Sequence, residues 1–471
     1  MTGSMTAKFY SYFRRAAALL LLTCCGAARA DDSVSLALDD AIRLALRQNL
    51  DMQTARERVT GADISVNAAQ AKFKLAIRPN VSGLYQQNDE LDQAYGLRLS
   101  KQFTTGGEAS WETRTQVDDS DEAEDPYQTD LIFAYTQPLL RGRGALAATA
   151  QLASAERAAR AQRRAFLVAQ QHLIIRAASA YYGIVRDQML LETHEQAVKR
   201  AQTLHAAAEA KLNVGMASKM DVFRAELQSL TAQNRLVDAR AALENAKRQF
   251  NVLLGSPLDA RYLFAAPLNY APVALDLDEL MRQALEHRLE LQTAQEQIDE
   301  AERQLNIARQ NLLPPLDVSV RYTLRGEGDG FRDSVKMEDE FWGVGVSSSF
   351  ALNLAEERAA YQQAQLSLNA AIRAWQATQD DILAEVMQTT IAVEQAQASV
   401  ALQAQSVTQA NKQLELAELR YKKGLSDNLD VLDAEENVMQ ANTGAYSAIA
   451  QHLIALLRLK QVTGTLEIPP E

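Results

Sequence analysis

Cysteine is almost absent from this sequence, with only Cys24 and Cys25 among 471 residues. Both lie near the N-terminus, in a stretch typical of an export signal. Three basic residues, an apolar run of seven residues and the small-x-small sequence Ala28-Arg29-Ala30 follow one another there. We therefore predict a signal peptide over residues 1–30, with lipid modification at Cys24 or Cys25 as the alternative. A chain cut after Ala30 has no cysteine for a disulfide or a thiolate metal site.

Long hydrophobic runs are lacking after the signal, so no later segment supplies the roughly 18 apolar residues of a membrane-spanning helix. An exported chain of this kind enters a membrane only as a β-barrel. Excess positive charge is lacking too: the formal net charge is −12, and −16 without residues 1–30. This acidity argues against a nucleic acid partner and suits a lumen that favours cations.

Glycine and proline are nearly absent from two very long stretches. Residues 145–213 contain one glycine and no proline, and residues 354–423 contain neither. Each stretch would reach roughly 100 Å as a helix at 1.5 Å per residue. Aromatic residues make up only 6% of the chain. Long helices packed through small residues, as in a coiled coil, are therefore predicted rather than a thick globular core.

What the sequence does contain is an internal duplication. Residues 36–55 align with residues 275–294 at an offset of 239, with ten of twenty positions identical. Tyr85 matches Tyr322 at an offset of 237, and from Phe133 and Trp342 onward the offset is 209, so the first half carries 28 extra residues between Tyr85 and Phe133. The chain is a tandem repeat in which each half has a helix, strands, a very long helix, a tight turn and a returning helix.

The segments between the helices alternate with a period of two. Val318, Val320, Tyr322 and Leu324 fall on one face of a predicted strand, with polar residues on the other. A membrane barrel with a wet lumen requires this pattern, and an ordinary sheet with one buried face also shows it. The export signal favours the barrel.

Motifs for enzymatic chemistry are lacking. The five histidines have no metal-binding spacing, and we expect them at exposed helical positions. The acidic stretches 118–125 and 326–340 lack the ligand spacing of a calcium loop, which favours solvated loops over cation sites. We therefore predict no enzyme activity, no cofactor and no metal site.

The sequence resembles the TolC-type outer-membrane efflux channels over nearly the whole mature chain. The resemblance rests on the duplicated first helix, on Gln137-Pro138-Leu139-Leu140 before a long helix, and on the two turn segments 213–222 and 421–434. It implies a homotrimer in the Gram-negative outer membrane, with a transmembrane β-barrel in contact with lipid and a periplasmic tunnel of helices. It also implies a periplasmic adaptor protein and an inner-membrane transporter as partners. The family contributes four barrel strands per chain, whereas this sequence offers six. The extra pair either extends the barrel or stands above it as an extracellular hairpin.

The predicted fold is mainly α with β: tandem-duplicated long helical hairpins plus strands of a trimeric barrel. The first repeat spans residues 31–254 and the second 277–464, separated by a linker and followed by a tail. The predicted segments are helix 38–76, strands at about 81–138, helices 145–213 and 218–254, linker 255–276, helix 277–311, strands at about 316–350, helices 354–423 and 427–462, and tail 465–471.

The two turns after the long helices are the predicted docking tips for the adaptor. Gly215 and Gly424 suit a left-handed helix stop, and Ser218-x-x-Asp221 and Asp427-x-x-Asp430 resemble N-terminal capping pairs. Well-capped hairpins with no docking role are the alternative. The residues that the resemblance assigns to docking are Val214, Gly215, Met216, Ala217, Ser218, Gly424, Leu425, Ser426 and Asp427.

The resemblance also implies a gate at the periplasmic end. Asp430 and Asp433 lie three residues apart on one helix face and fall where the family places its constricting aspartates. In a trimer they form two carboxylate rings that bind multivalent cations. Asp221 and Tyr421 fall where the family has an acid–tyrosine link, and Ser426 replaces a locking arginine. The alternative for Asp430 is an ordinary acidic residue in a first helical turn.

The predicted function is thus a passive outer-membrane exit duct of a tripartite efflux or type I secretion system. A periplasmic adaptor or a coiled-coil scaffold without a pore is the alternative. The duplicated hairpin and the alternating strands of this sequence argue against an adaptor or scaffold.

Overall fold

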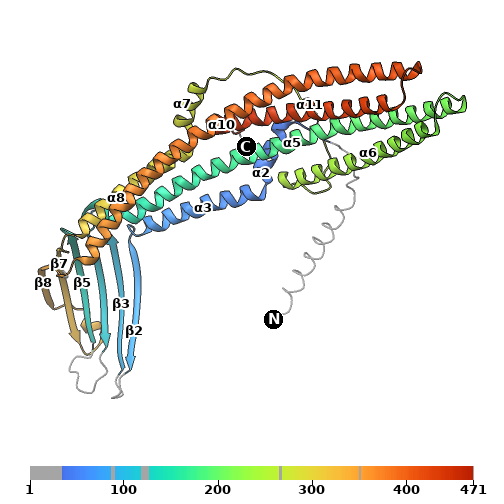
Figure 1. Cartoon of the computed structure of the whole chain (residues 1–471). Helices are drawn as coiled ribbons and strands as arrows, with labels where there is room; N and C mark the ends of the chain where they lie inside the picture. Colours follow the sequence, from blue (N-terminus) through green and yellow to red (C-terminus); the bar gives the residue numbers. More distant parts are fainter. Residues whose placement is uncertain (1–33, 86–90, 118–126, 265–267, 350–351, 470–471) are drawn as a thin grey trace, which may run out of the picture.

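The structure is a computed structural model that describes residues 34–85, 91–117, 127–264, 268–349 and 352–469. A bundle of long helices carries a six-stranded antiparallel sheet at one end (Figure 1). The predicted signal peptide with its two cysteines, and the acidic stretch 118–125, lie outside the described residues.

The described helices fall into two similar series, one from each repeat. In chain order they are α2 (Leu38–Gln48), α3 (Leu50–Ala71), α4 (Gly144–Ala148), α5 (Ala150–Asn213), α6 (Lys219–Leu254), α7 (Leu277–His287), α8 (Leu289–Asn311), α9 (Phe331–Ser334), α10 (Ala355–Lys422) and α11 (Leu429–Val462). No helix among the described residues combines the length and the apolarity needed to cross a membrane.

The strands form two sheets. They are β1 (Val34–Leu36), β2 (Ala76–Tyr85), β3 (Leu91–Gln102), β4 (Glu108–Val117), β5 (Tyr127–Pro138), β6 (Tyr262–Phe264), β7 (Asp317–Gly328) and β8 (Asp339–Ser347). β1 and β6 pair in parallel, and the larger sheet has the order β2-β3-β4-β5-β7-β8.

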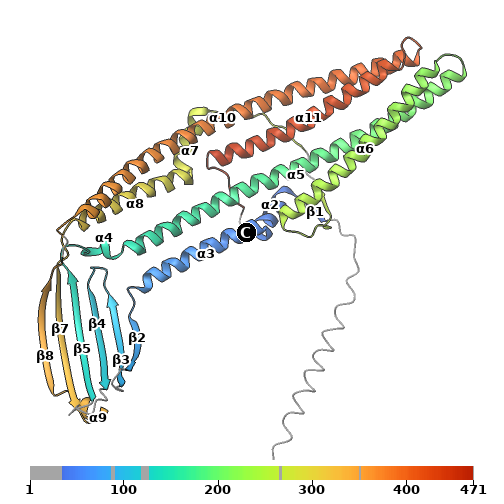
Figure 2. The same cartoon turned by 60° about the horizontal axis from the view of Figure 1, so that its bottom comes forward.

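The helical bundle is a layer with two free sides. Towards the tips, α6 packs on α5, α5 on α11 and α11 on α10; towards the sheet, the order is α3, α5, α8 and α10 (Figure 2). α5 and α10 are 64 and 68 residues long, and many of the residues that α5 buries are alanines. Small side chains at these contacts let the helices approach closely, as the sequence predicts.

Two predicted helices are each broken in the middle. The segment 38–76 consists of α2 and α3 and ends at Ala71, and 277–311 consists of α7 and α8. The break falls at Asn49 in one repeat and at Arg288, 239 positions later, in the other. Both residues have extended backbone angles. The side-chain oxygen of Asn49 accepts the backbone N–H groups of Asp51 and Met52. Asn49 therefore caps α3 and stabilises the break between α2 and α3.

The largest core lies midway along the bundle, where α2, α5 and the end of α6 meet the small sheet. Tyr181, Phe250 and Phe264 form an edge-on cluster with ring centroids 5.4 to 6.3 Å apart. The Tyr181 hydroxyl donates to the carbonyl oxygen of Leu36 at 3.0 Å. This core joins the first repeat to the linker region and holds the helices together at the middle of the bundle.

One face of the larger sheet is apolar across all six strands. The predicted alternation of β7 is present, because Val318, Val320, Tyr322 and Leu324 lie in register with β5 and β8 positions on the same face. Trp111, Phe133 and Tyr322 stand side by side on it, with successive ring centroids 6.4 Å apart. The opposite face carries ion pairs, Arg98–Glu112 between β3 and β4 and Asp130–Arg325 between β5 and β7.

Candidate functional site at the helical tips

Both long helices end at their predicted glycine in the same way. Gly215 and Gly424 have φ angles of 76° and 72°, in the left-handed region that favours glycine. The N–H of Met216 donates to the Lys211 carbonyl at 2.8 Å, and that of Leu425 to the Arg420 carbonyl at 2.9 Å. Each of these bonds joins residues five positions apart, satisfies a carbonyl at the end of its helix and closes a tight turn.

The two returning helices begin differently. Ser218 and Asp221 form a capping box: the Asp221 amide donates to Oγ of Ser218 at 3.2 Å, and the Ser218 amide to Oδ2 of Asp221 at 2.9 Å. The second predicted pair is present only in part: α11 begins at Leu429, and Asn428 before it already has helical backbone angles and makes no side-chain cap bond. Asp427 instead accepts the N–H of Leu429 at 3.2 Å. Within the described residues the first pair is therefore a complete capping box, and the second is a cap from Asp427 without the reciprocal bond from Asp430.

Asn428 joins the two tips. It is fully buried, and its Nδ2 donates to the carbonyl oxygen of Asp221 at 2.7 Å. On the other side, Lys211 donates to the carbonyl oxygen of Tyr421 and lies over the Tyr421 ring, 3.5 Å from its centroid. Neither Asn428 nor Lys211 was singled out from the sequence, where no local pattern distinguishes them from ordinary tip residues.

Asp221 and Tyr421 are neighbours without a hydrogen bond between them. The carboxylate of Asp221 is held by Ser218, whose backbone N–H and hydroxyl lower the Asp221 pKa. The Tyr421 hydroxyl is buried and has no hydrogen-bond partner among the described residues. Burial raises the pKa of Tyr421, and the nearby Asp221 charge raises it further. An acid–tyrosine link would require Asp221 to leave its capping position.

Asp430 and Asp433 lie together on the exposed side of α11. The opposite side of the same turns, with Val431 and Ala434, is buried against the neighbouring helices. Both aspartates are therefore free to face a neighbouring chain or a lumen.

One acidic residue near the aspartates is buried instead. Glu435 is only 6% exposed, and its Oε1 lies 3.5 Å from Nε of Arg200 on α5. Burial raises the Glu435 pKa to about 7, with Glu418 adding to the rise and Arg200 opposing it. Its neighbour Glu436 pairs with Arg235 of α6, Nη1 to Oε2, at 2.5 Å. A sequence signal for Glu435 existed, because a charged residue interrupts the buried face of Val431, Ala434 and Val438.

The tips expose apolar side chains to solvent. The exposed fractions of Val214, Met216 and Leu425 are 69, 67 and 67%. Ala217, Ser218, Gly424 and Asp427 lie beside them in the same two turns. Ser426 lies deeper, with its hydroxyl buried and without a partner among the described residues. Each tip thus exposes at least one large apolar side chain among the predicted docking residues.

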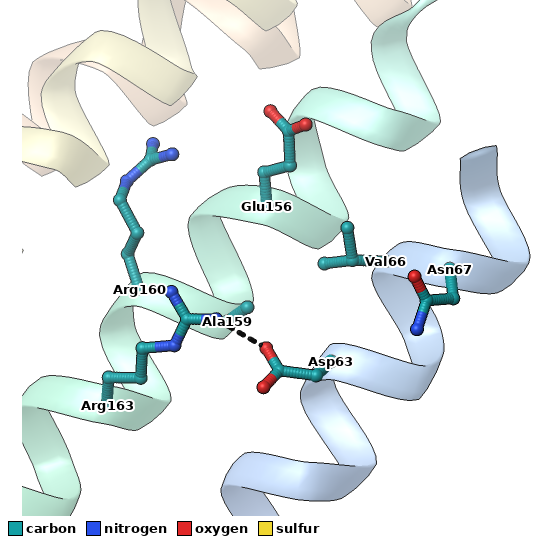
Figure 3. A pocket seen from close by; sticks show the side chains of 7 residues that line it. All are labelled: Asp63, Val66, Asn67, Glu156, Ala159, Arg160 and Arg163. Atoms are coloured by element: carbon teal, nitrogen blue, oxygen red, sulfur yellow. Dashed lines mark hydrogen bonds and ion pairs between the residues drawn. The ribbon is translucent and has the colours of Figure 1, made fainter.

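A hollow between α3 and α5, far from the tips, contains none of the predicted site residues (Figure 3). Its volume is about 380 Å³, and charged side chains and Ala159 line it. Nη2 of Arg163 reaches Oδ1 of Asp63 at 2.7 Å, and Arg160 turns away towards Glu296 of α8. These ion pairs connect neighbouring helices, so the hollow is an interhelical groove.

The prediction that all five histidines are exposed is wrong. His452 is fully buried on α11, with its ring centroid 5.1 Å from that of Tyr270 and Nε2 3.3 Å from the Ala271 carbonyl oxygen. It fixes the linker region on α11. Within the described residues, no cluster of His, Cys, Asp or Glu is arranged to hold a metal ion.

Comparison with known proteins places both halves of the chain in one family. The family described as "Outer membrane efflux protein" matches residues 41–256 and 280–465, which correspond to the two repeats. The outer membrane protein TolC of Vibrio cholerae is 24% identical over 426 residues, covering 85% of this chain and 94% of that protein. TolC of Escherichia coli K12 is 26% identical over 326 residues, covering 66% and 65%.

Solved structures share the fold. The outer membrane protein VceC of Vibrio cholerae superposes with a TM-score of 0.70 at 17% identity, covering 91% of this chain and 96% of that one. The CmeC outer membrane channel of Campylobacter jejuni gives 0.70 at 14% identity, covering 92% and 87%. The open state of the MtrE channel of Neisseria gonorrhoeae gives 0.64 at 19% identity, covering 92% and 90%. With its two matched repeats, its long helical hairpins and its antiparallel sheet, the chain belongs to the outer membrane efflux protein family and is a protein of the Gram-negative outer membrane.

Proposed function

We propose that three copies of this chain enclose a water-filled duct that carries solutes out through the outer membrane. The observation that carries the proposal is that the same two sides of the chain are unpartnered in both of its parts. One side consists of β2, α3 and α6, and the other of β8 and α10. A single rotation that places one side against the other closes the sheet and the helical layer together.

The free side of α6 is built as a helix-packing seam. Met220, Phe223, Leu227, Leu230 and Val237 recur every three, four or seven residues, and each is more than half exposed. α10 exposes Ile391, Leu402, Leu416 and Leu419 on the opposite side of the layer. A heptad stripe of large apolar residues in water is stabilised by packing on a second helix, which supports α6 of one copy meeting α10 of the next.

The tips form the periplasmic gate of this duct. A threefold axis turns Asp430 and Asp433 into two rings of three carboxylates, whose mutual repulsion favours bound divalent cations. Val214, Met216 and Leu425 supply apolar contacts for the helical tips of a periplasmic adaptor. The adaptor in turn connects the duct to an inner-membrane transporter. This arrangement makes the protein a conduit of a tripartite assembly rather than an enzyme.

The gate is tested by replacing both aspartates. We expect Asp430→Ala with Asp433→Ala to raise single-channel conductance in planar bilayers and to weaken block by divalent cations. Loss of six negative charges from a constriction lowers its affinity for cations and widens it. The matched control is Asp238→Ala on α6, which removes an exposed acid that is not on α11.

Unchanged conductance and unchanged block in the double variant would remove Asp430 and Asp433 from the gate. A purified protein that forms no ion-conducting pore at all would contradict the conduit and favour an adaptor or scaffold role.

A further inference from the structure

We propose that the hairpin β3–β4 is a built-in part of the barrel wall, so that the trimer closes with eighteen strands through seams between β2 and β8. The inference rests on the proposed trimeric duct. It goes beyond that proposal because a chain with four strands would give a twelve-stranded barrel. Of the two positions that the sequence left open for the extra strands, this is the one inside the wall.

The repeat alignment identifies β3 and β4 as the added strands. β2 corresponds to β7 at an offset of 237, and β5 corresponds to β8 at an offset of 209. In the second repeat β7 pairs directly with β8, whereas in the first β3 and β4 lie between the equivalent strands. Ten residue pairs join β2 to β3, and ten join β4 to β5. The hairpin is therefore inserted in the sheet over the full length of its neighbours.

The turn between β3 and β4 is anchored at the junction of sheet and helices. The N–H of Gly144 donates to the Thr105 carbonyl at 2.9 Å, and Nε2 of Gln137 donates to the same oxygen at 3.2 Å. Gly106 has a φ of 94°, and a Cβ there would lie 2.8 Å from the Gly142 carbonyl oxygen. A hairpin standing above the membrane would have no reason for this fit against the chain that leads into α4 and α5.

The number of strands permits closure by identical copies. The sheet is antiparallel throughout and has six strands, so its edge strands β2 and β8 run in opposite directions. An even count lets β8 of one chain continue antiparallel onto β2 of the next, and unpaired edges do not persist in lipid. Their lengths also match, at ten and nine residues.

The apolar face reaches both edges. Ile77 and Val81 on β2 are 62 and 75% exposed, and Trp342, Val344 and Val346 on β8 are 77, 62 and 69% exposed. The register relates both groups to the same face as Phe133 and Tyr322. Strands of this length, apolar outwards and charged inwards, fit a membrane barrel, and the joined copies would carry one uninterrupted apolar band.

Eighteen strands change what the outer mouth can pass. Barrel diameter grows roughly in proportion to strand number, so the wall is about half as wide again as one of twelve strands, with about twice the cross-section. Barrels of 16–18 strands keep an aqueous channel. The narrow point of the duct is then at the helical tips, and selection takes place there rather than at the barrel.

Two measurements test the strand number. The first is electron cryo-microscopy of the unmodified trimer in lipid nanodiscs, where we expect eighteen strands around the barrel. The second uses paired cysteines in the mature chain, which otherwise has none. Gly345→Cys on β8 is combined in turn with Arg78→Cys, Asn80→Cys or Ser82→Cys on the same face of β2. We expect one combination to give a disulfide-linked trimer on a denaturing gel that separates into single chains on reduction.

The control pair is Ser82→Cys with Thr136→Cys on β5, because these positions correspond to Ser319 and Gly345, which lie opposite each other in β7 and β8. This pair cross-links within one chain only if β3 and β4 leave the sheet, so we expect no disulfide. A twelve-stranded trimer, or efficient β2–β5 cross-linking, would refute the eighteen-stranded barrel and leave the proposed duct intact. A protein that forms no trimer would instead refute the duct itself. Imaging of the unmodified chain decides the matter even if the cysteine variants fold poorly.

Discussion

Glu435 is the side chain whose charge state most directly depends on the contact between the two hairpins. Its pKa of about 7 in the folded protein lies above the ordinary value of 4.5. Between these values the folded state holds a proton that the unfolded state has lost, so stability falls as the pH rises from about 4.5 to 7. Above about pH 7 the loss is complete, and the ionised carboxylate faces Arg200.

We expect Glu435→Gln to flatten the dependence of Tm on pH between pH 5 and 7.5 and to raise Tm at the upper end. The amide keeps the shape of the buried acid and has no proton to lose. Thermal unfolding across this pH range provides the measurement, and Glu436→Gln, which affects a more exposed neighbour, is the control. Equal slopes in wild type and Glu435→Gln would show that other groups cause the dependence.

The residue scale also shows what local sequence can predict. The helix stops at Gly215 and Gly424 and the capping box of Ser218 and Asp221 depend on neighbours within five positions, and the sequence predicted them. The contact of Asn428 with Asp221 joins residues 207 positions apart. No local pattern contains that information.

At the scale of elements, α6 is the helix that most clearly lacks a partner. Its apolar stripe has the spacing of a coiled-coil seam, and within one chain α6 packs mainly on α5, with a smaller contact to α2. The breaks at Asn49 and Arg288 show the opposite situation. There the long helical periodicity hides a junction, capped by a side chain at Asn49 but not at Arg288, because the periodic pattern continues on both sides.

We expect Leu227→Asp, placed in the middle of the α6 stripe, to shift the purified protein from trimer towards single chains in detergent. A carboxylate buried in an apolar seam has no counter-charge and loses its hydration. Light scattering coupled to size-exclusion chromatography measures the change. The same substitution at Leu258, which is 63% exposed in the linker, is the control. A Leu227→Asp trimer as stable as the wild type would exclude this face from the interface.

At the scale of the whole molecule, the chain consists of two hairpins joined near their tips by a buried apolar cluster and by several polar contacts. Asn428 bonds to Asp221, Lys211 to Tyr421, and Arg235 to Glu436. In the proposed duct, opening at this end separates the two hairpins, so these contacts favour the proposed closed arrangement.

We expect Asn428→Ala to raise the fraction of time that the pore is open while the trimer remains intact. The substitution removes a buried hydrogen bond between the two tips, at a cost of about 0.5–1.5 kcal/mol. Single-channel recording measures the open fraction. Asp427→Ala, next to it but exposed, is the control, and equal opening in the two variants would argue against a latch at Asn428.

The sequence by itself determined the duplication, the long helices, the two tips and the alternating strands, because each depends on residue spacing along one segment. Only the tertiary structure decided that β3 and β4 enter the sheet. It also decided that the two free sides of the chain consist of β2 with α6 and of β8 with α10. It also brought Glu435 against Arg200. Such relations join segments tens to hundreds of residues apart, and they follow from how whole elements pack rather than from any periodicity within one of them.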